Sequence, residues 1–360
     1  MLARIDHRLR YFLSQSLSPA MYTKLYSATR SWYLKLLSKE LITLHPSNYK
    51  PTSILGLNFR NDLGNAAGLD KDGSLLAFNY HMGAGFAIVG TVLNKPHTGN
   101  LIKSLPFLPK TNPWAPLPYS NSCLNSMGLP SKGYQIALDS IKKFRDIYQA
   151  TDFPIGISIM GHPLETGQEK IDGVCNVIKA VCNDVDFIEI NESCPNVKGH
   201  NNDGLNIRLA SFVQARDLGS KHTPLLVKFG NVHNTKETIK ILDSNNIDGI
   251  TAVNTQTNYE DLILKLNPKD KTLFNYYTKN HNGGLSGSII NQHSFKTITN
   301  IATEIKELKS NLCLMHVGGI TNNDDIQKSR AIAPLRQWYT GYMGALGSMQ
   351  PNLIYKTMTK

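Results

Sequence analysis

The sequence lacks the patterns with which proteins usually build disulfide frameworks and zinc sites. Its five cysteines are odd in number and include no CxxC pair, and no HExxH motif occurs. Disulfide-rich and zinc-binding proteins depend on such paired spacings. We therefore expect a reducing compartment and no bound metal.

Long apolar runs are also missing. No segment stays apolar for the roughly 20 residues that a membrane-spanning helix needs. The N-terminus has neither a continuous apolar core nor an A-x-A-type cleavage site. The sequence therefore predicts no membrane-spanning helix and no secretory signal.

Acidic residues are scarce relative to basic ones. The chain has 38 Lys and Arg against 27 Asp and Glu, which gives a net charge of +11 and a pI of about 9.3. Such an excess favours polyanions, anionic membranes or anionic small molecules without selecting among them. With 41% hydrophobic residues the chain is globular, and its 360 residues allow one large α/β domain with an appendage.

Acids are scarcest before Glu40, where residues 1–45 predict a pair of amphipathic helices. Apolar and aromatic residues recur there at helical spacing: Leu2, Ile5, Leu9, Phe12, Leu13, Met21, Tyr22, Leu25, Tyr26, Trp32, Tyr33, Leu36 and Leu37. Ser18-Pro19 is typical of the start of the second helix. A basic helix pair with such a broad aromatic face favours a membrane interface. The alternative is a hairpin that docks on its own domain with a solvated basic face.

After a linker-like segment at 46–51, residues 52–360 predict a (β/α)₈ TIM barrel. Eight short apolar or small-residue runs alternate mostly with helix-like stretches, which indicates a parallel sheet. The runs are 64–67, 85–92, 155–160, 187–191, 225–228, 249–254, 314–318 and 337–341. The last is the least regular, because Arg336 and Gln337 are unusual in a buried strand. Eight such units in about 300 residues fit this barrel.

Nearly every run ends in a polar residue or glycine. These ends are Asn65, Thr91, Ser158, Asn191, Lys228, Asn254, Gly318-Gly319 and Tyr339-Thr340. The carboxyl ends of barrel strands meet at one rim, where barrel enzymes hold substrate. The fourth run passes directly into the polar segment 191–199, where Pro195 ends the strand and Cys194 can take or give a proton. Each polar end alone would be an ordinary turn, but together they predict an active site.

Glycine-rich segments at 283–287, 317–320 and 339–341 offer backbone amides without obstruction by Cβ atoms. Barrels often bind phosphate at the loops after strands 7 and 8. The alternative is a set of tight turns that need positive φ. Two long connections, residues 94–134 and 255–287, are expected to act as lids or binding loops.

Two lysines are candidates for ligand contact. Lys228 ends an apolar run, where its charge is costly to bury unless it meets an anion or a polarised ring such as a flavin. Lys71 is flanked by Asp70 and Asp72, so a surface salt bridge is the rival interpretation. Asparagine side chains could supply a ring of donors and acceptors, or each could be a turn residue: Asn125, Asn191, Asn196 and Asn254.

In chain order, these motifs resemble dihydroorotate dehydrogenase from about residue 52 to the C-terminus. The matching segments are 65–73 (NAAGLDKDG), 125–128 (NSMG), 191–196, 227–228, 254–255 and 283–287. The LGLNFRN start at 55–61 and the helix pair before it look like the membrane-associated, quinone-using class.

The resemblance implies an FMN at the barrel mouth. The cofactor-binding residues would be Ala67, Gly68, Lys71, Thr91, Ser158, Asn191, Lys228, Asn254, Gly287, Gly318, Gly319, Tyr339 and Thr340. Dihydroorotate and orotate would bind Lys71, Asn125, Ser126, Met127, Gly128, Leu129, Asn191, Asn196, Asn254 and Thr255. Cys194 falls where the family places its base, which removes the C5 proton while a hydride passes from C6 to flavin N5.

The same resemblance implies that electrons pass to a quinone near the N-terminal helices. It also implies that the chain is a peripheral membrane protein and has no nucleic-acid partner. The expected place is the cytoplasmic face of the inner membrane, or the mitochondrial inner membrane in a eukaryote.

The sequence departs from the quinone-using class at several positions. Cys194 stands where that class typically has serine, and a thiol needs less activation than a hydroxyl to act as a base near neutral pH. Ser158 replaces the usual asparagine, and Glu192 puts an acid beside an anion-binding site. Residues 101–110 lack the usual arginine-rich pattern, and the eighth strand lacks the usual Gly-Ala start.

Two other functions fit parts of the sequence. A flavin barrel similar to tRNA dihydrouridine synthase would account for the high pI and for a Cys-Pro at a strand end, although no basic C-terminal RNA-binding domain is evident. A diverged flavin-binding protein of low activity is the other. Tight tRNA binding that weakens steeply with salt would favour the first, and bound FMN that dihydroorotate does not reduce would favour the second.

Overall fold

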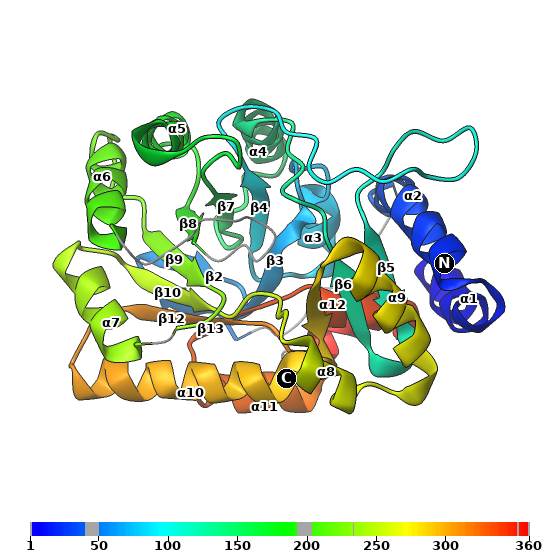
Figure 1. The fold of residues 1–360 in the computed structure, drawn as a ribbon. Coiled ribbons are helices and arrows are strands. Elements are labelled where there is room, and N and C mark those ends of the chain that lie inside the picture. Colours follow the sequence, from blue (N-terminus) through cyan, green and yellow to red (C-terminus); the bar gives the residue numbers. More distant parts are fainter. Residues whose placement is uncertain (1, 40–49, 193–203, 233, 351–352, 359–360) are drawn as a thin grey trace.

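The computed structural model describes residues 2–39, 50–192, 204–232, 234–350 and 353–358. Eight parallel strands close into a barrel in the order β10-β12-β13-β3-β4-β7-β8-β9 (Figure 1). They are β3 (Leu63–Asp70), β4 (Ala87–Val92), β7 (Ile155–Ile159), β8 (Phe187–Asn191), β9 (Leu225–Phe229), β10 (Gly249–Ala252), β12 (Cys313–Val317) and β13 (Leu335–Trp338). Each overlaps one of the eight predicted runs, so the predicted (β/α)₈ barrel is confirmed.

The eighth strand lies earlier than the sequence predicts. β13 includes Arg336 and Gln337, and the chain turns into helix α12 (Thr340–Ser348) where the strand was expected to continue. Successive strand residues point to opposite sides of a sheet. Arg336 accordingly pairs with Asp62 outside the barrel, whereas Gln337 bonds to Glu189 inside it. Both polar side chains are satisfied, which explains why a buried strand tolerates them.

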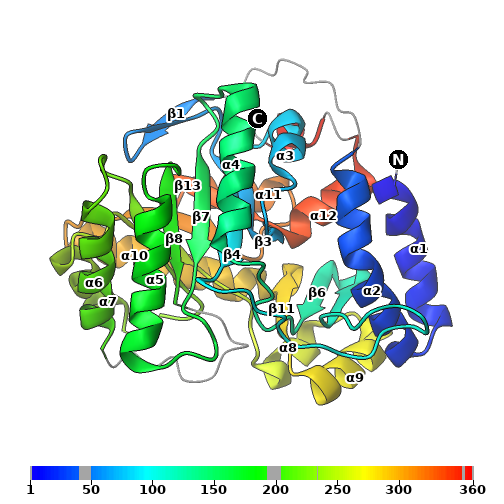
Figure 2. The same ribbon diagram turned by 90° about the horizontal axis from the view of Figure 1, so that it is seen from above.

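Helices cover the outside of the barrel, as Figures 1 and 2 show. They are α3 (Leu76–Met82), α4 (Tyr134–Tyr148), α5 (Gly167–Val181), α6 (Leu205–Asp217), α7 (Thr235–Ser244), α10 (Asn291–Glu307), α11 (Asn323–Arg330), α12 and α13 (Ile354–Met358). Because helices shield one face of each strand and the barrel interior the other, most barrel strands are buried along their whole length. This is why they read in sequence as continuous apolar runs.

Aromatic rings fill the amino end of the barrel. The hairpin of β1 (Thr52–Ile54) and β2 (Leu57–Phe59) carries Phe59, whose ring centroid lies 5.5 Å from that of Phe86. Phe86 in turn lies 6.1 Å from Phe187. A Cβ atom at Gly64 would come within 2.4 Å of the Phe86 ring, so glycine is required there. The described residues at this end of the barrel interior therefore form a packed core.

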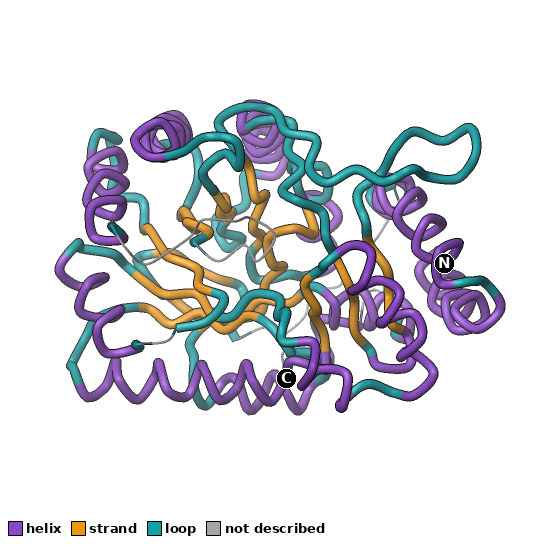
Figure 3. Tube along the Cα trace, viewed as in Figure 1, coloured by secondary structure: helices purple, strands orange, loops and turns teal. Residues whose placement is uncertain are grey.

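The two long connections pair with each other. Their strands form a three-stranded antiparallel sheet in the order β11-β6-β5, separate from the barrel in Figure 3. The elements of the two connections are β5 (Trp114–Leu117), η1 (Pro118–Ser120), β6 (Ser122–Asn125), α8 (Tyr259–Lys265), η2 (Pro268–Asp270), α9 (Lys271–His281) and β11 (Gly284–Gly287), followed by η3 (Ser288–Ile290). The sequence predicted lids or binding loops here but not their pairing, which builds a wall beside the barrel mouth.

The predicted N-terminal helix pair is present as α1 (Leu2–Ser16) and α2 (Pro19–Leu37). Ser18 caps α2, since its Oγ accepts a hydrogen bond from the amide of Met21 at 3.3 Å. One face of α2 packs against the rest of the protein. Tyr22 and Tyr26 are buried, and the ring centroid of Tyr26 lies 6.2 Å from that of Trp114 in β5. The docking alternative therefore holds for this face.

Helix α1 packs against α12 but leaves another face open. Ile5, Leu9 and Phe12 recur at helical spacing and are exposed. Within the described ranges, no helix has both the length and the apolar character needed to cross a membrane. Most of the linker-like segment 46–51 lies outside the described residues.

Candidate functional site

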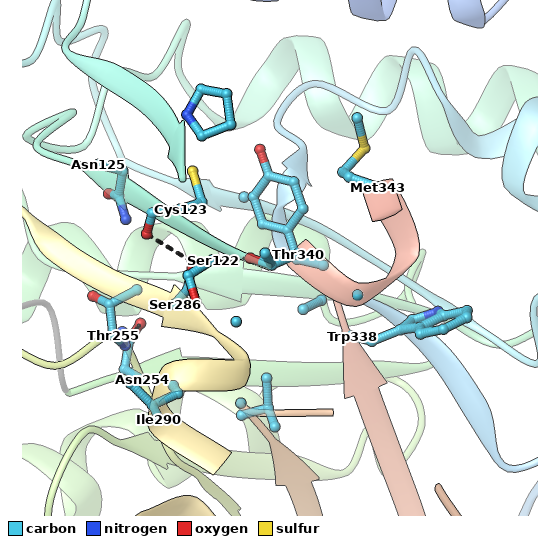
Figure 4. Close-up of a pocket in the computed structure, with 18 of the residues that line it drawn as sticks. Ser122, Cys123, Asn125, Asn254, Thr255, Ser286, Ile290, Trp338, Thr340 and Met343 are labelled. Atoms are coloured by element: carbon cyan, nitrogen blue, oxygen red, sulfur yellow. Dashed lines mark hydrogen bonds between the residues drawn. The ribbon is translucent and has the colours of Figure 1, made fainter. Parts of the chain in front are cut away.

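A cavity, partly open to solvent, lies at the carboxyl ends of the barrel strands. Side chains from β6, β11, α12 and the segment after β10 converge on it in Figure 4. The structure brings these predicted site residues to its wall: Ala67, Gly68, Lys71, Thr91, Asn125, Met127, Gly128, Leu129, Asn191, Lys228, Asn254, Thr255, Gly287, Gly318, Gly319, Tyr339 and Thr340. Residues from both long connections and from most barrel strands thus share one cavity.

Two predicted site residues lie behind this wall. Ser126 is buried, and its Oγ donates to the carbonyl of His281 at 2.6 Å. The Oγ of Ser158 lies 3.0 Å from Oγ1 of Thr91, which accepts a hydrogen bond from Nδ2 of Asn191 at 3.2 Å. Ser158 therefore touches the cavity wall through Thr91. Cys194 and Asn196 lie outside the described residues.

The glycine clusters and the start of α12 form one edge of the cavity. Gly318 and Gly319 have φ of +102° and +72°, and a Cβ atom at Gly319 would come within 2.5 Å of Asn291 Cα. No acid occupies the first turn of α12, and Thr340 Oγ1 lies 2.9 Å from Ser286 Oγ. Backbone amides at a helix N-terminus, flanked by hydroxyls, fit a phosphate group. The positive-φ alternative is confirmed for Gly287, Gly318 and Gly319, and the phosphate site at the same residues stays a prediction.

Lys228 has a carboxylate partner that the sequence interpretation missed. Its Nζ lies 3.5 Å from Oε1 of Glu189, and Gln337 Nε2 donates to Glu189 Oε2 at 2.8 Å. Strands β8 and β13 stand opposite each other in the barrel order, so the Gln337 bond crosses the interior. Alternation along β8 puts Glu189 on the same face as Asn191, and this signal could have revealed it.

Lys71 also lines the cavity. The acids beside it in sequence make other contacts: Asp72 pairs with Lys132 at 2.7 Å, and Asp70 accepts a hydrogen bond from the amide of Leu75 at 3.0 Å. Lys71 itself donates a hydrogen bond from Nζ to the carbonyl of Pro130 at 3.5 Å.

Glu192, the acid unexpected beside an anion site, is paired with Arg208 from α6. Glu192 Oε2 and Arg208 Nη2 are 2.9 Å apart, and both side chains are largely shielded from water. An ion pair of this kind neutralises the carboxylate locally. The charge of Glu192 is therefore balanced by Arg208, and Glu192 is not among the described residues that line the cavity.

Amide groups of the predicted ring are held by the backbone. Asn254 Oδ1 accepts a hydrogen bond from the amide of Thr255 at 2.8 Å, and Asn125 Nδ2 donates to the carbonyl of Gly284 at 3.4 Å. Figure 4 shows these three side chains on the same side of the cavity. Fixed amides of this kind can present donors and acceptors to a planar polar ligand.

Cys123 also lines the cavity, but it lies on β6 and is buried. Pairing of β6 with β5 and β11 makes this segment a strand. Burial raises the pKa of the Cys123 thiol to about 12, so the thiol stays protonated near neutral pH. Although Cys123 lines the cavity, it is not a candidate base.

The cavity reaches the N-terminal helices. His7, Arg10 and Tyr11 of α1 contribute to its wall. Arg30 of α2 donates to the hydroxyl of Tyr339 at 2.8 Å and to the carbonyl of Gly68 at 2.9 Å. These contacts could not be predicted from the sequence, because helical periodicity shows which face of a helix is apolar but not what that face contacts.

Comparisons with known proteins agree on one family. A family model described as dihydroorotate dehydrogenase matches residues 50–356. A dihydroorotate dehydrogenase (quinone) from Yersinia enterocolitica is 31% identical over 316 residues, covering 82% of this chain and 83% of the relative. One from Chromobacterium violaceum is 28% identical over 310 residues, covering 82% and 81%.

A solved structure is similar in fold. The crystal structure of DHODH from Eimeria tenella in complex with ferulenol matches with a TM-score of 0.74 at 20% identity, covering 94% of this chain and 92% of that one.

Proposed function

The chain belongs to the dihydroorotate dehydrogenase family, and from that premise we propose that it oxidises dihydroorotate to orotate with FMN and passes the electrons to a quinone. One observation carries this proposal. A single cavity runs from the glycine-rich strand ends to helix α1, so one space can serve a cofactor, a polar substrate and a second, apolar ligand.

FMN would be held at the barrel mouth. Its phosphate would lie on the amides of Gly287, Gly318 and Gly319 and on Thr340, where the start of α12, with no acid in its first turn, favours an anion. Lys228 would face the ring, and its partner Glu189 keeps the lysine fixed. When bound, FMN supplies a hydride acceptor and an electron carrier to the quinone.

The substrate would be bound by fixed amides and a cation. Asn125, Asn254 and Thr255 would hold the pyrimidine ring, and Lys71 would meet its carboxylate. We assign the base to Cys194, which follows β8 in sequence and would take the C5 proton. We further include Ser126, Met127, Gly128, Leu129, Asn191 and Asn196 in the substrate site, and Ala67, Thr91, Ser158 and Tyr339 in the cofactor site.

The quinone would enter from the helix pair. His7, Arg10 and Tyr11 line that end of the cavity, and the lining also includes the apolar residues Leu117 and Met343. We propose residues 1–45 as the unit that meets the membrane and 52–360 as the FMN-binding barrel. The protein would sit peripherally on the cytoplasmic face of the inner membrane, or on the mitochondrial inner membrane in a eukaryote.

An anaerobic visible spectrum of the purified protein, recorded before and after addition of dihydroorotate, tests this function. Flavin bands that bleach with dihydroorotate, and return when a quinone is added, are the expected result. Bands that persist would contradict the substrate, and no flavin band even after reconstitution with FMN would contradict the cofactor site. Recovery with fumarate or NAD but not with quinone would contradict the acceptor.

A further inference from the structure

The connection after β4 carries an exposed apolar tip, residues 103–110 (KSLPFLPK), here called the 103–110 loop. Phe107 is fully exposed and Leu108 is exposed. Phe107 also has φ of +66°, a region that bulky side chains rarely adopt. An aromatic residue held exposed in an unfavourable backbone conformation stabilises nothing within this chain. Such an outlier indicates a role in contact with something outside it.

The base of the 103–110 loop is fixed to helix α2. Ile102 and Thr111 exchange two backbone hydrogen bonds, of 2.8 and 3.1 Å, which close the loop. Thr111 Oγ1 donates to the carbonyl of Ser27 at 2.7 Å, and the amide of Trp114 donates to Ser27 Oγ at 2.9 Å. Figures 1 and 2 both show the connection passing α2 and extending at the edge of the molecule that α1 occupies. The tip therefore projects from an anchored base.

Charge identifies the kind of partner. Residues 96–113 contain Lys103 and Lys110 and no acid. Helix α1, at the same edge of the molecule, is also basic and exposes the apolar face described above. Aromatic and aliphatic side chains flanked by lysines are typical of segments that enter the interface of an anionic bilayer. A second copy of this chain would bring the same positive charge to the contact, which disfavours a dimer through this surface.

We propose that the 103–110 loop is a second membrane-binding element, in which Phe107 and Leu108 enter the interface of an anionic lipid bilayer. The inference rests on the proposed function, because that function brings the chain to a membrane quinone. It adds a contact that the N-terminal helices do not make. The loop base bonded to Ser27 would hold α2, and the cavity end beside it, at a fixed position relative to the lipid.

Vesicle co-sedimentation of the full chain tests the proposal. We would use phosphatidylcholine vesicles with and without roughly a quarter of phosphatidylglycerol. The variant Phe107→Ser/Leu108→Ser should bind the anionic vesicles about tenfold more weakly than the wild type. Leu218→Ser, at an exposed leucine after α6 on the opposite side of the barrel, is the matched control and should bind like the wild type.

A second variant tests the insertion of position 107 into lipid without the double substitution. Phe107→Trp should show added fluorescence that brominated lipids quench. Equal binding of wild type and double variant, or no quenching at position 107, would overturn the loop assignment. A salt-sensitive dimer in solution that the double variant abolishes would also overturn it.

Different measurements test the membrane proposal and the proposed function. Wild-type protein that stays off the vesicles while dihydroorotate still bleaches its flavin would overturn the membrane assignment as a whole and leave the chemistry standing. A flavin that dihydroorotate does not bleach would contradict the chemistry, whatever the vesicles show.

Discussion

Removing the charge of Glu189 should destabilise the barrel strongly. Glu189 is completely buried, and Lys228 nearly so. At the observed 3.5 Å and an effective dielectric constant of about 20, their attraction is about 5 kcal/mol. In Glu189→Gln the lysine loses its buried partner, and breaking a buried pair in this way typically costs about 3–5 kcal/mol. We expect the free energy of unfolding to fall by that amount.

Urea unfolding followed by far-UV circular dichroism measures this change. The double variant Glu189→Gln/Lys228→Met removes both charges and should recover most of the loss, because no unpaired charge remains buried. Asp152→Asn is the matched control: Asp152 pairs with Arg60 at 2.7 Å but is half exposed, so its loss should cost about 1 kcal/mol or less. Additive effects of the Glu189 and Lys228 substitutions would refute the reasoning, since a coupled pair cannot behave additively.

For three further substitutions, the structure predicts the direction of the effect on stability or on FMN binding. Burial lowers the pKa of His316 to about 3, so stability present above pH 6.5 should be lost as pH falls towards 3, by up to about 5 kcal/mol. His316→Gln should flatten that dependence in unfolding titrations. Burial raises the pKa of Asp70 to about 7. The contribution of the protonated carboxyl to the free energy of unfolding is therefore complete below about pH 4 and is lost as the pH rises through 7. Asp70→Asn should therefore raise the melting temperature at pH 8 more than at pH 5. Gly319→Val should weaken FMN binding at least about tenfold by fluorescence titration, whereas retained affinity would contradict the phosphate site.

Periodicity and strand ends were enough to predict the barrel and the rim at which the candidate site lies. Parallel strands buried on both faces read as continuous apolar runs, and their carboxyl ends must meet at one rim. This is why residues as distant in sequence as Lys71 and Thr340 could be expected together. The boundary of β13 was missed because Arg336 and Gln337 look polar until their partners, Asp62 and Glu189, are known.

Pairings between distant segments could not be predicted. The sheet of β5, β6 and β11 joins residues 114–125 to 284–287. Neither segment has a sequence pattern that predicts which segment it pairs with. The contacts of Arg30 with Tyr339 and Gly68 depend on how a helix docks, which a helical pattern alone leaves undetermined. Local patterns thus predicted the elements, whereas the wall of the cavity depends on their docking.

The docking of the helix pair changes how an N-terminal truncation must be interpreted. Deleting residues 1–45 would remove the proposed membrane surface, but it would also remove His7, Arg10 and Tyr11 from the cavity wall. Loss of quinone turnover in such a truncation would follow from either cause. Substitutions in the 103–110 loop leave the cavity wall intact, because none of those residues lines it. A loop variant that loses vesicle binding but still reduces a water-soluble quinone would therefore separate attachment to the membrane from the chemistry at the far end of the cavity.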